Sequence, residues 1–296
     1  MNTRDLAYFR TLVEVKNYTV VAQKFAVSQP AVTQAIHRLE KEFDVKLVIQ
    51  DRRHQRTEIT RAGQLLYKNA QAIQANIALA HREIESSKQP LIRFGLPPII
   101  GTMYFTNIAG ELLDTGYLPQ LAITETGSGE LLTKLEHGDI DIALLGSFEP
   151  LALPAIHAVQ LGSRPFSVIV SPKHHLAHRQ SVSFKELGDE KFIGLTGKYV
   201  HPGAFNEFCH AAGVAPKIIY NTPDISWAKG LVKANLGISL LVRDIVNSDD
   251  GLICLDISDQ VPTSFNVSVA TRNGYVLTAT EQQFIDKLLT MQIQPE

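Results

Sequence analysis

The sequence predicts an α/β protein in three parts: a small helical N-terminal module, one long helix, and a larger domain of alternating strands and helices. Three observations predict this. Apolar residues recur at helical spacing up to about residue 45. From Thr60 to about Ser87 the chain has no proline and only one glycine, near its start. After Pro90, short apolar strands alternate with helical segments, which is typical of α/β domains.

The N-terminal module is expected to have a three-helix core. Its first helix runs roughly over Asp5–Lys16, with an apolar face made of Leu6, Phe9, Leu12 and Val13. A second helix begins near Thr19, whose hydroxyl can cap it. Ser28 then caps a third helix, with Pro30 in its first turn. Helical spacing turns four residues of that third helix inward: Ala31, Ala35, Ile36 and Leu39.

The other face of the third helix carries mostly polar side chains. The residues that face outward or flank are Gln29, Val32, Thr33, Gln34, His37 and Arg38. In a helix-turn-helix, the first residues of the second helix of the motif reach base edges in the major groove. Gln29 and Gln34 can pair with adenine edges. Thr33 can contact a thymine methyl or a phosphate, and Arg38 a phosphate or a guanine.

An ordinary helical hairpin with a polar face would show the same pattern, but two neighbouring features favour DNA binding. The first helix completes a three-helix core. Residues 52–56 read Arg-Arg-His-Gln-Arg, between the apolar pair at 47–48 and Ile59. Two short strands with a cationic tip would form a wing that meets phosphates or a minor groove.

Charge is distributed unevenly along the 296 residues. Residues 1–68 hold 12 Lys+Arg against 7 Asp+Glu, a net charge of +5, whereas the whole chain carries −2. A basic module on an acidic body is typical of a nucleic-acid reader joined to another domain. We find no N-terminal signal segment and no apolar run of about 18 residues, and therefore expect a cytoplasmic protein with no membrane partner. The two cysteines, Cys209 and Cys254, are expected to be buried thiols rather than a redox pair.

The long helix from Thr60 to about Ser87 carries two apolar stripes with a spacing of seven residues. They are Leu66, Ile73 and Ala80, and Ala70, Ile77 and Ile84. A helix of about 40 Å with such stripes favours pairing with a second helix, although docking on its own domain is the alternative. Pairing would let two third helices reach DNA half-sites one helical turn apart. The helix is expected to end in a hinge at 86–90.

The larger domain is expected to contain a series of short elements. The predicted strands are Leu91–Gly95, Leu121–Glu125, Asp141–Leu145, Phe166–Ser171 and Lys191–Leu195. The predicted helices between them are Thr102–Leu113 and Gly129–His137.

Taken together, these motifs resemble the LysR-type transcriptional regulators. The resemblance rests mainly on Ala22 and Phe25, on Val-Ser-Gln-Pro-Ala-Val-Thr-Gln-Ala-Ile at 27–36, and on Ile-Thr-Arg-Ala-Gly at 59–63. The wing departs from the family pattern. Leu-Val-Ile-Gln at 47–50 stands where Leu-Phe-x-Arg is usual, and the wing is about two residues longer. The Arg-Arg-His tip at 52–54 resembles that of regulators of malolactic fermentation.

The resemblance implies DNA contacts from Gln29, Pro30, Thr33 and Gln34. With the residues argued above and two wing arginines, the expected contacts are Ser28, Gln29, Pro30, Thr33, Gln34, His37, Arg38, Arg53 and Arg56. The expected partners are double-stranded DNA with a dyad site, the chain itself as a dimer or tetramer, and RNA polymerase. The sequence does not choose between activation and repression, nor does it name the target genes.

The resemblance also divides the chain. A winged helix-turn-helix would occupy residues 1–59, a linker helix with its hinge residues 60–90, and an effector-binding domain residues 91–296. That last domain resembles periplasmic binding proteins, with two α/β lobes joined by crossing strands near 162–165 and 265–269. Lobe one would comprise 91–162 plus 268–296, and lobe two 163–267.

In such a domain, ligands bind beyond the carboxyl ends of the strands, where helix N-termini favour anions. Four loops meet this condition, and Ser128 is a candidate N-cap in one of them. The expected effector contacts are Pro98, Ile99, Thr102, Ser128, Thr196, His201 and Ile225. We expect no cofactor, but a small organic effector of the carboxylate class, with malate suggested by the narrower resemblance.

Other chemistry finds little support in the sequence. His-His-Leu-Ala-His at 174–178 is dense enough for a metal site, but it has no cysteine and no acidic partner unless folding supplies one, so no metal is expected. Asp139 and Asp141 suit a turn and a strand start better than a catalytic pair. We therefore expect no enzyme. The alternative is a small-molecule-binding or enzymatic α/β protein with a helical oligomerisation domain.

Overall fold

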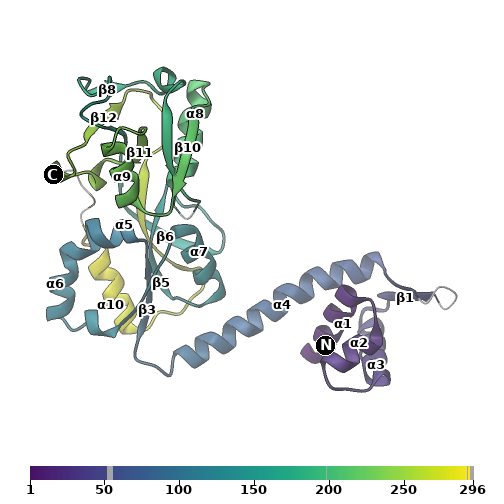
Figure 1. Cartoon of the computed structure of the whole chain (residues 1–296). Helices are drawn as coiled ribbons and strands as arrows, with labels where there is room; N and C mark the ends of the chain where they lie inside the picture. The colour runs from purple at the N-terminus through teal and green to yellow at the C-terminus, as the bar shows by residue number, and fades with distance from the viewer. Residues whose placement is uncertain (52–55, 198, 292, 294–296) are drawn as a thin grey trace. The chain divides into compact units, whose positions relative to one another are not determined.

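A computed structural model describes residues 1–51, 56–197, 199–291 and 293 (Figure 1). The chain divides into two compact units, Met1–Lys88 and Gln89–Glu296, each with its own core. The first unit contains α1 (Thr3–Val15), α2 (Tyr18–Lys24), α3 (Gln29–Phe43), β1 (Val48–Asp51), β2 (Arg56–Ile59) and α4 (Arg61–Ser86). Among the described helices of both units, we find none with the length and apolar character needed to cross a membrane.

The core of the first unit joins α1, α2, α3 and the first half of α4. Its fully buried members include Leu6, Phe9, Ile36 and Leu39. Ser28 caps α3 as expected, because its hydroxyl accepts a hydrogen bond from the Ala31 amide. The expectation that Thr19 caps α2 is wrong. Asn17 does so, accepting from the amides of residues 19 and 20, because its side chain precedes the first helical residue.

The expected inward face of α3 needs one correction. Val32 is buried and Ala31 only half-buried, so the stripe runs through Val32, Ala35, Ile36 and Leu39. The packing of Val32 in the core of the first unit decides which face of the helix is buried. The polar side chains on the outer face are nevertheless mostly exposed.

Helix α4 is a single helix of 26 residues, capped by Thr60. Its start is packed so closely that only glycine fits: a Cβ on Gly63 would lie 2.3 Å from the carbonyl oxygen of Leu47. Leu66 and Ile73 pack on the core of the first unit, and Ala70 is buried there. Thus the apolar residues in the first half of α4 pack within the first unit itself, whereas Ile84, near the end of the helix, is 64% exposed.

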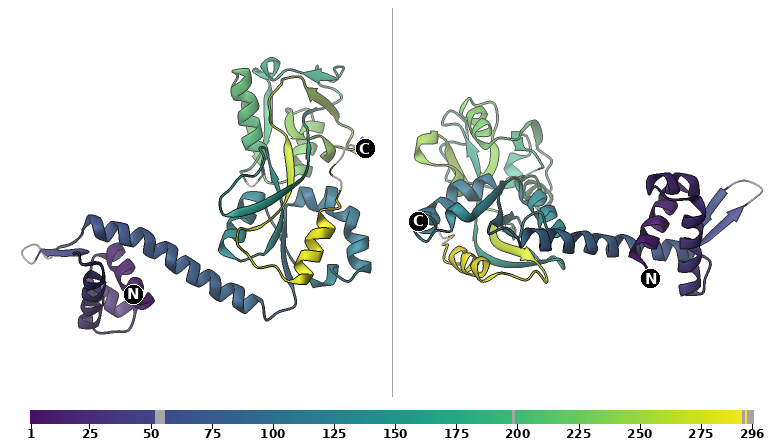
Figure 2. Two further views of the ribbon diagram at one scale, coloured as in Figure 1. Left: turned by 180° about the vertical axis from the view of Figure 1, so that it is seen from behind. Right: turned by 90° about the horizontal axis from the view of Figure 1, so that it is seen from below.

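The second unit begins with a five-stranded sheet of order β4-β3-β5-β13-β6. Strands β3 (Ile92–Leu96), β4 (Leu121–Glu125) and β5 (Ile142–Ser147) are parallel, while β13 (Phe265–Arg272) runs antiparallel to β5 and β6 (Ile156–Arg164). Helix α7 (Ser128–His137) packs on one face against Ala143 and Leu145. The other face, with Ile142 and Leu144, is covered by α6 (Thr106–Asp114) and α10 (Ala279–Leu288) (Figure 2). Successive side chains of β5 point to opposite faces of the sheet, and both faces are buried because a helix layer covers each side.

Lobe two is built on two smaller strand groups. One has the order β11-β7-β12-β8, and the other pairs β9 with β10 in parallel; a bridge from Phe192 to Ile238 joins the groups. Their elements are β7 (Phe166–Val170), β8 (Ser181–Val182), β9 (Lys191–Leu195), α8 (His201–Ala212), β10 (Lys217–Thr222), α9 (Ile225–Lys233), β11 (Ser239–Val242) and β12 (Ile253–Ile257). Short helices lie between these strands: η3 (Phe184–Leu187), η4 (Arg243–Ile245) and η5 (Ser248–Asp250).

The chain passes between the lobes twice. It leaves lobe one where β6 ends at Arg164 and β7 begins at Phe166, and it returns where β13 begins at Phe265. The lobe boundaries expected from the sequence therefore fall inside β6 and β13.

In place of the single expected helix at 102–113, the segment after β3 folds as α5 (Pro98–Ile100), a π-helical turn η1 (Gly101–Phe105) and α6. A 3₁₀ turn, η2 (Leu118–Gln120), precedes β4.

Candidate functional site

Helix α3 displays the side chains expected to read DNA. Six of them are exposed, and Thr33 is half-buried. The exposed six are Ser28, Gln29, Pro30, Gln34, His37 and Arg38. Gln29 Nε2 donates to Thr33 Oγ1 at 3.4 Å, and Thr33 Oγ1 donates to the Gln29 carbonyl oxygen at 3.2 Å. These two side chains therefore meet an approaching duplex as one polar unit.

Arg38 has a structural partner that the sequence argument missed. Its Nε and Nη2 donate to the two carboxylate oxygens of Asp5 at 2.8 and 2.6 Å, and Asp5 is buried in α1. The hydrogen bond to Asp5 raises the pKa of Arg38 above its ordinary value. The bidentate pair ties α1 to α3, so a DNA contact by Arg38 would use its remaining N–H groups.

Glu40 anchors the base of the wing and was also missed. Its carboxylate accepts hydrogen bonds from the amides of Leu47 and Val48 and from Lys46 Nζ, at 3.0, 3.4 and 2.8 Å. Burial alone would raise the pKa of Glu40, but these bonds and one with His37 lower it below its ordinary value. An acidic residue one helical turn after His37 was the available signal, yet its partners in the wing lie six to eight residues further on and are brought to it only by folding.

The wing itself is an antiparallel pair in which Val48 lies opposite Ile59 and Asp51 opposite Arg56. Arg53 lies outside the described residues. Arg56 is described only as the first residue of β2. Both remain predicted DNA contacts.

Between the two lobes lies a cleft with two openings. The smaller one is almost filled and is lined by Pro97, Ile99, Gly127, Ser128, Tyr199, Val200 and Phe265. The larger is a cavity of about 470 Å³. It is bounded on the lobe-one side by Ser128 and the segment 146–153, and on the lobe-two side by Gly197, Tyr199, Val200 and Gly203. The two openings share Ser128, Tyr199 and Val200, so they form one continuous site.

Ser128 lies at the centre of this cleft, although not as the expected N-cap. It is the first residue of α7, and Gly127 occupies the cap position without a side-chain bond. Ser128 Oγ instead accepts a hydrogen bond from the amide of Gly146 at 2.9 Å, because the buried end of β5 needs an acceptor there. As an acceptor of that bond, the hydroxyl keeps its hydrogen for another partner.

Thr196 and His201, two predicted effector contacts, are buried polar groups of lobe two that line neither opening of the cleft. Thr196 Oγ1 and both ring nitrogens of His201 are buried and have no hydrogen-bond partner among the described residues. Burial lowers the pKa of His201 to about 3, so the ring is neutral. It packs edge-on against Phe166 and Tyr199, with centroid distances of 5.7 and 6.1 Å. Leaving such groups unpaired costs free energy, which a bound polar molecule or water would recover.

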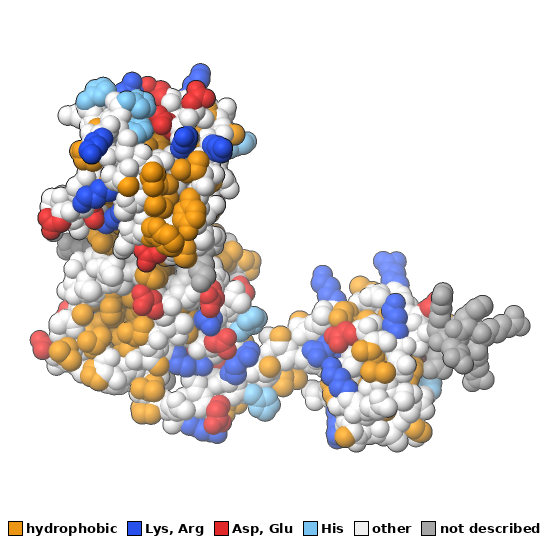
Figure 3. Space-filling model, viewed as in Figure 1, with side chains coloured by type: hydrophobic (Ala, Val, Ile, Leu, Met, Phe, Trp, Pro, Cys, Tyr) orange, Lys and Arg blue, Asp and Glu red, His pale blue; other side chains and the backbone are white. Residues whose placement is uncertain are grey.

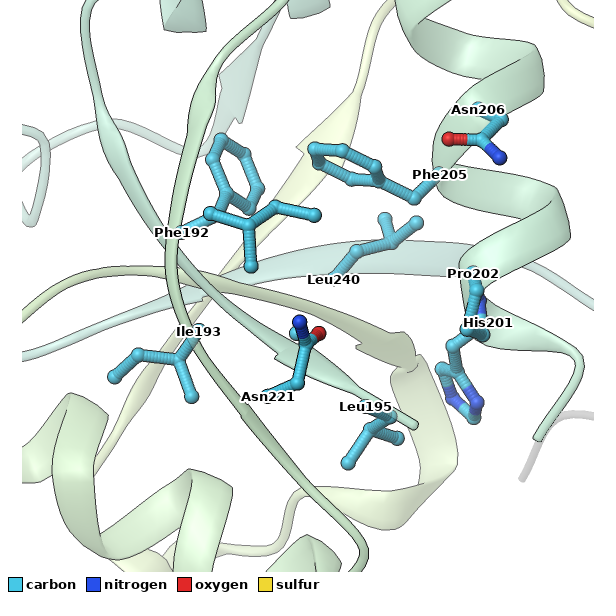
Figure 4. A pocket seen from close by; sticks show the side chains of 11 residues that line it. Phe192, Ile193, Leu195, His201, Pro202, Phe205, Asn206, Asn221 and Leu240 are labelled. Atoms are coloured by element: carbon cyan, nitrogen blue, oxygen red, sulfur yellow. The ribbon is translucent and has the colours of Figure 1, made fainter. Parts of the chain in front are cut away.

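His201 also lines a second, mostly apolar pocket inside lobe two, between α8 and the strands β9 and β10 (Figure 4). Phe192, Leu195, Phe205 and Leu240 form most of its wall. With about 50 Å³ of space it holds only a few water molecules. The cleft between the lobes is the larger of these two sites.

The remaining predicted effector contacts differ in whether they line the cleft. Ile99 lines the smaller opening, whereas Pro98, Thr102 and Ile225 line neither opening. The Thr102 hydroxyl donates to the carbonyl oxygen of Pro98 at 2.9 Å, in its own helical turn. Tyr199, Val200 and Phe265 line the cleft and were missed, because aromatic and apolar loop residues give no sign in sequence of facing a ligand.

An ion-pair cluster links the lobes beside the crossing strands. Asp244, in lobe two, accepts from Nη2 of Arg164 at 2.6 Å and also from its Nε; Arg164 ends β6. Tyr104, in lobe one, donates its hydroxyl to Asp244 Oδ2 at 2.9 Å. Burial, followed by the charge of Asp244, raises the pKa of Tyr104 well above its ordinary value. These three residues hold the two lobes together through charge-assisted hydrogen bonds.

Exposed apolar side chains gather on lobe two, over β10 and α9 (Figure 3). They are Ile218, Ile219, Tyr220, Trp227 and Leu236, each between 39% and 53% exposed. Trp227 and Tyr220 lie 5.6 Å apart, ring to ring. Single exposed apolar residues are common, but a contiguous patch marks an interaction surface.

Two features considered as possible chemistry have structural roles. Asp141 is buried and accepts from Nε and Nη2 of Arg93 at 2.8 and 2.6 Å, which fixes the start of β5 to β3. Cys209 and Cys254 are free thiols, but both are half-buried rather than buried as expected. Burial raises the pKa of both, that of Cys209 to about 11, which disfavours the reactive thiolate.

Comparison with known proteins agrees with this geometry. The family model described as "Bacterial regulatory helix-turn-helix protein, lysR family" matches residues 3–64, and that described as "LysR substrate binding domain" matches residues 85–292. Over 293 residues the chain is 32% identical to a malolactic fermentation system transcriptional activator of Lactococcus lactis, with 98% of this chain and 99% of that protein covered. The DNA-binding transcriptional dual regulator OxyR of Escherichia coli (strain K12) is 25% identical over 295 residues, covering 97% of this chain and 95% of that protein.

Solved structures share the fold. The LysR family regulator HinK of Pseudomonas aeruginosa superposes with a TM-score of 0.54 and 22% identity, covering 97% of each chain. The effector binding domain of QuiR, solved with shikimate, has a TM-score of 0.61 and 17% identity, covering 68% of this chain and 96% of that one. The matched relatives are transcriptional regulators, which decides against the enzymatic alternative. With a DNA-binding helix-turn-helix, an effector-binding domain and a family model that spans most of the chain, this protein belongs to the LysR family of transcriptional regulators.

Proposed function

We propose that this regulator responds to a small organic anion, a carboxylate, bound between the lobes of its second unit. The observation that carries the proposal is the 470 Å³ cavity bounded by Ser128 and Tyr199. Ligand sites for small molecules are typically of this size. The cavity takes residues from both lobes, so a ligand in it could favour one lobe arrangement over another.

The chemistry around the cavity favours an anion. Helices α7 and α8 both begin beside the cleft, at Ser128 and His201, and helix N-termini offer free amide N–H groups and partial positive charge. The Ser128 hydroxyl adds a further donor. Thr196 and the neutral His201 ring, buried and unpaired among the described residues, lie in lobe two but do not line the cavity itself.

Malate is the first carboxylate to test. The name of the Lactococcus relative concerns malolactic fermentation, and that protein shares nearly the full length of this chain. The QuiR domain was solved with shikimate, another small hydroxy-carboxylate, and serves as a second test compound.

On the DNA side, we propose base contacts from Gln29, Thr33 and Gln34, with Ser28, Pro30 and His37 at the rim and Arg38, Arg53 and Arg56 at phosphates. The exposure of α3 supports this reading. Regulators of this family typically act as oligomers, and a dimer or tetramer would suit a dyad DNA site. The exposed end of α4 and the apolar patch over β10 and α9 are candidate contact surfaces between copies. RNA polymerase is a further candidate partner at the bound promoter.

The experiment is a selection of DNA fragments bound by the full-length chain, followed by fluorescence anisotropy on the selected site at several salt concentrations. We expect a dyad sequence, a steep loss of affinity with salt, and a change in affinity or DNA bending when malate or shikimate is added. Binding to DNA that is unaffected by any of a panel of small carboxylates would refute the proposed effector class. Failure to select any sequence would refute the DNA contacts.

A further inference from the structure

The turn that follows β7 carries two adjacent histidines that folding brings onto an acidic side chain. His174 and His175 lie in this turn, and Glu190 lies directly before β9. The His175 Nε2 atom is 2.7 Å from Glu190 Oε1, and the His174 Nε2 atom is 3.4 Å from Glu190 Oε2. The sequence alone gave no acidic partner for these histidines. In the structure, Glu190 is that acidic partner, fifteen or sixteen positions further along the chain.

The backbone around the cluster is fixed. The His174 amide donates to the Ser171 carbonyl at 2.9 Å, and the Glu190 amide donates to the Leu187 carbonyl at 3.1 Å. The two imidazole rings lie 4.5 Å apart, centroid to centroid. The side chains of His174 and Glu190 are 11% and 19% exposed, whereas that of His175 is 69% exposed. The cluster is therefore anchored on one side and open to solvent on the other (Figure 3 shows histidine and acidic side chains gathered at the β8 end of lobe two).

The spacing of the polar atoms fits a metal ion. One ligand atom from each of the three residues lies within 4.8 Å of the other two. A tetrahedral zinc ion with bonds of about 2.0–2.1 Å requires ligand atoms about 3.4 Å apart. The distance of 3.4 Å between His174 Nε2 and Glu190 Oε2 already meets this value, whereas the 2.7 Å between His175 Nε2 and Glu190 Oε1 would have to widen to it.

We propose that His174, His175 and Glu190 bind a divalent transition-metal ion, zinc in the first instance, with water completing the coordination. Two imidazoles and one carboxylate are a ligand set that suits zinc, as well as cobalt and nickel. A bound ion would join the turn after β7 to the segment before β9. It would thereby stabilise lobe two according to its concentration and affinity.

The hydrogen bonds of the cluster limit how tightly it could bind an ion. One contact opposes binding: the Leu176 amide donates to His174 Nδ1 at 3.3 Å, and coordination through Nε2 would place a hydrogen on that nitrogen. The lost bond and the absence of a fourth protein ligand from the described cluster predict a weaker site than a closed structural zinc site.

The test uses the full-length chain, stripped of metal with a chelator and titrated with zinc chloride in a calorimeter. We expect one ion per chain at this site, and binding reduced at least tenfold in Glu190→Gln and in His175→Ala. Because His175 is largely exposed, its replacement leaves the fold intact. His178→Ala is the matched control, since His178 lies in the same segment but outside the cluster, and it should bind as the unaltered chain does.

Two further readouts separate a metal site from a set of hydrogen bonds. Cobalt should give visible absorption bands of a low-symmetry nitrogen and oxygen site, and Glu190→Gln should abolish them. Zinc should also raise the melting temperature of the unaltered chain but not that of His175→Ala. The proposal is overturned if the unaltered chain binds no zinc, or if His175→Ala and Glu190→Gln bind it as well as His178→Ala does.

Discussion

Replacing Asp244 should destabilise the effector-binding unit more than the loss of any exposed ion pair. The side chains of Arg164 and Asp244 are only 10% and 15% exposed, and Asp244 accepts from both Arg164 and Tyr104. Asp244→Asn removes the negative charge while keeping the shape of the side chain. The Arg164 guanidinium, whose pKa the hydrogen bond to Asp244 raises, would then remain charged without its counter-ion.

The expected magnitude follows from burial. Breaking a buried pair by removing one partner costs about 3–5 kcal/mol, and the residual exposure here favours the lower end, about 3 kcal/mol. For a unit of this size, each kcal/mol lowers the melting temperature by about 2–4 °C, so the expected drop is about 6–12 °C. Tyr104→Phe removes one hydrogen bond to a charged group and should cost about 1.5 kcal/mol.

The assay is urea unfolding followed by the fluorescence of Trp227, the only tryptophan, which lies in α9 of lobe two and reports this unit alone. Arg179→Ala is the matched control. It breaks the pair with Glu186 in the same lobe, but those side chains are 39% and 48% exposed, so the loss should stay below about 1 kcal/mol. A loss for Asp244→Asn no greater than that of the control would refute the argument that the buried cluster holds the lobes together.

Three further outcomes are expected. Gln29→Ala and Thr33→Ala should each weaken binding to the selected DNA site by about 1–3 kcal/mol and leave binding to random DNA nearly unchanged, as measured by anisotropy; equal losses on both DNAs would contradict base reading. Glu40→Gln should make the stability of the first unit less sensitive to acid, as measured by circular dichroism against pH. Because folding lowers the pKa of Glu40, its carboxylate stabilises the unit above about pH 4.5, and this stabilisation is lost as the pH falls below that value. An unchanged acid profile in the variant would contradict this role of Glu40. Gly63→Ala should destabilise the same unit by more than about 1 kcal/mol in thermal unfolding, because a Cβ would lie 2.3 Å from a carbonyl oxygen; a neutral result would mean that the start of α4 can move.

The local signals in the sequence were sufficient for much of the fold. Ser28 with Pro30 identified the start of α3, and the apolar runs at 121–125 and 191–195 coincide with β4 and β9. Each of these depends on residues that are adjacent in the chain. The N-cap of α2 was misplaced because Asn17 and Thr19 are both good caps and only the backbone decides between them.

The candidate sites were less accessible from the sequence, because their determinants are distant contacts. Asp5 pairs with Arg38 across 33 positions, and Tyr104 meets Asp244 across 140. Ser128 was chosen for a capping role, yet its hydroxyl binds the amide of Gly146 on a neighbouring strand. Periodicity shows which face of an element is buried, but not which other element covers it.

The link between the Arg164–Asp244–Tyr104 cluster and effector binding can be argued from free energies. A ligand shifts two lobe arrangements only by its difference in affinity for them, and a shift from 1:99 to 99:1 requires about 5.5 kcal/mol. The cluster joins both lobes, so if it forms only in the arrangement that binds the effector, it raises the population of that arrangement before any ligand is bound. An effector held by Ser128 on one side and Tyr199 on the other must still supply the whole shift from its starting ratio, through hydrogen bonds that it makes in only one arrangement. Tyr104→Phe would in that case lower the apparent affinity for the effector even though Tyr104 lines neither opening of the cleft.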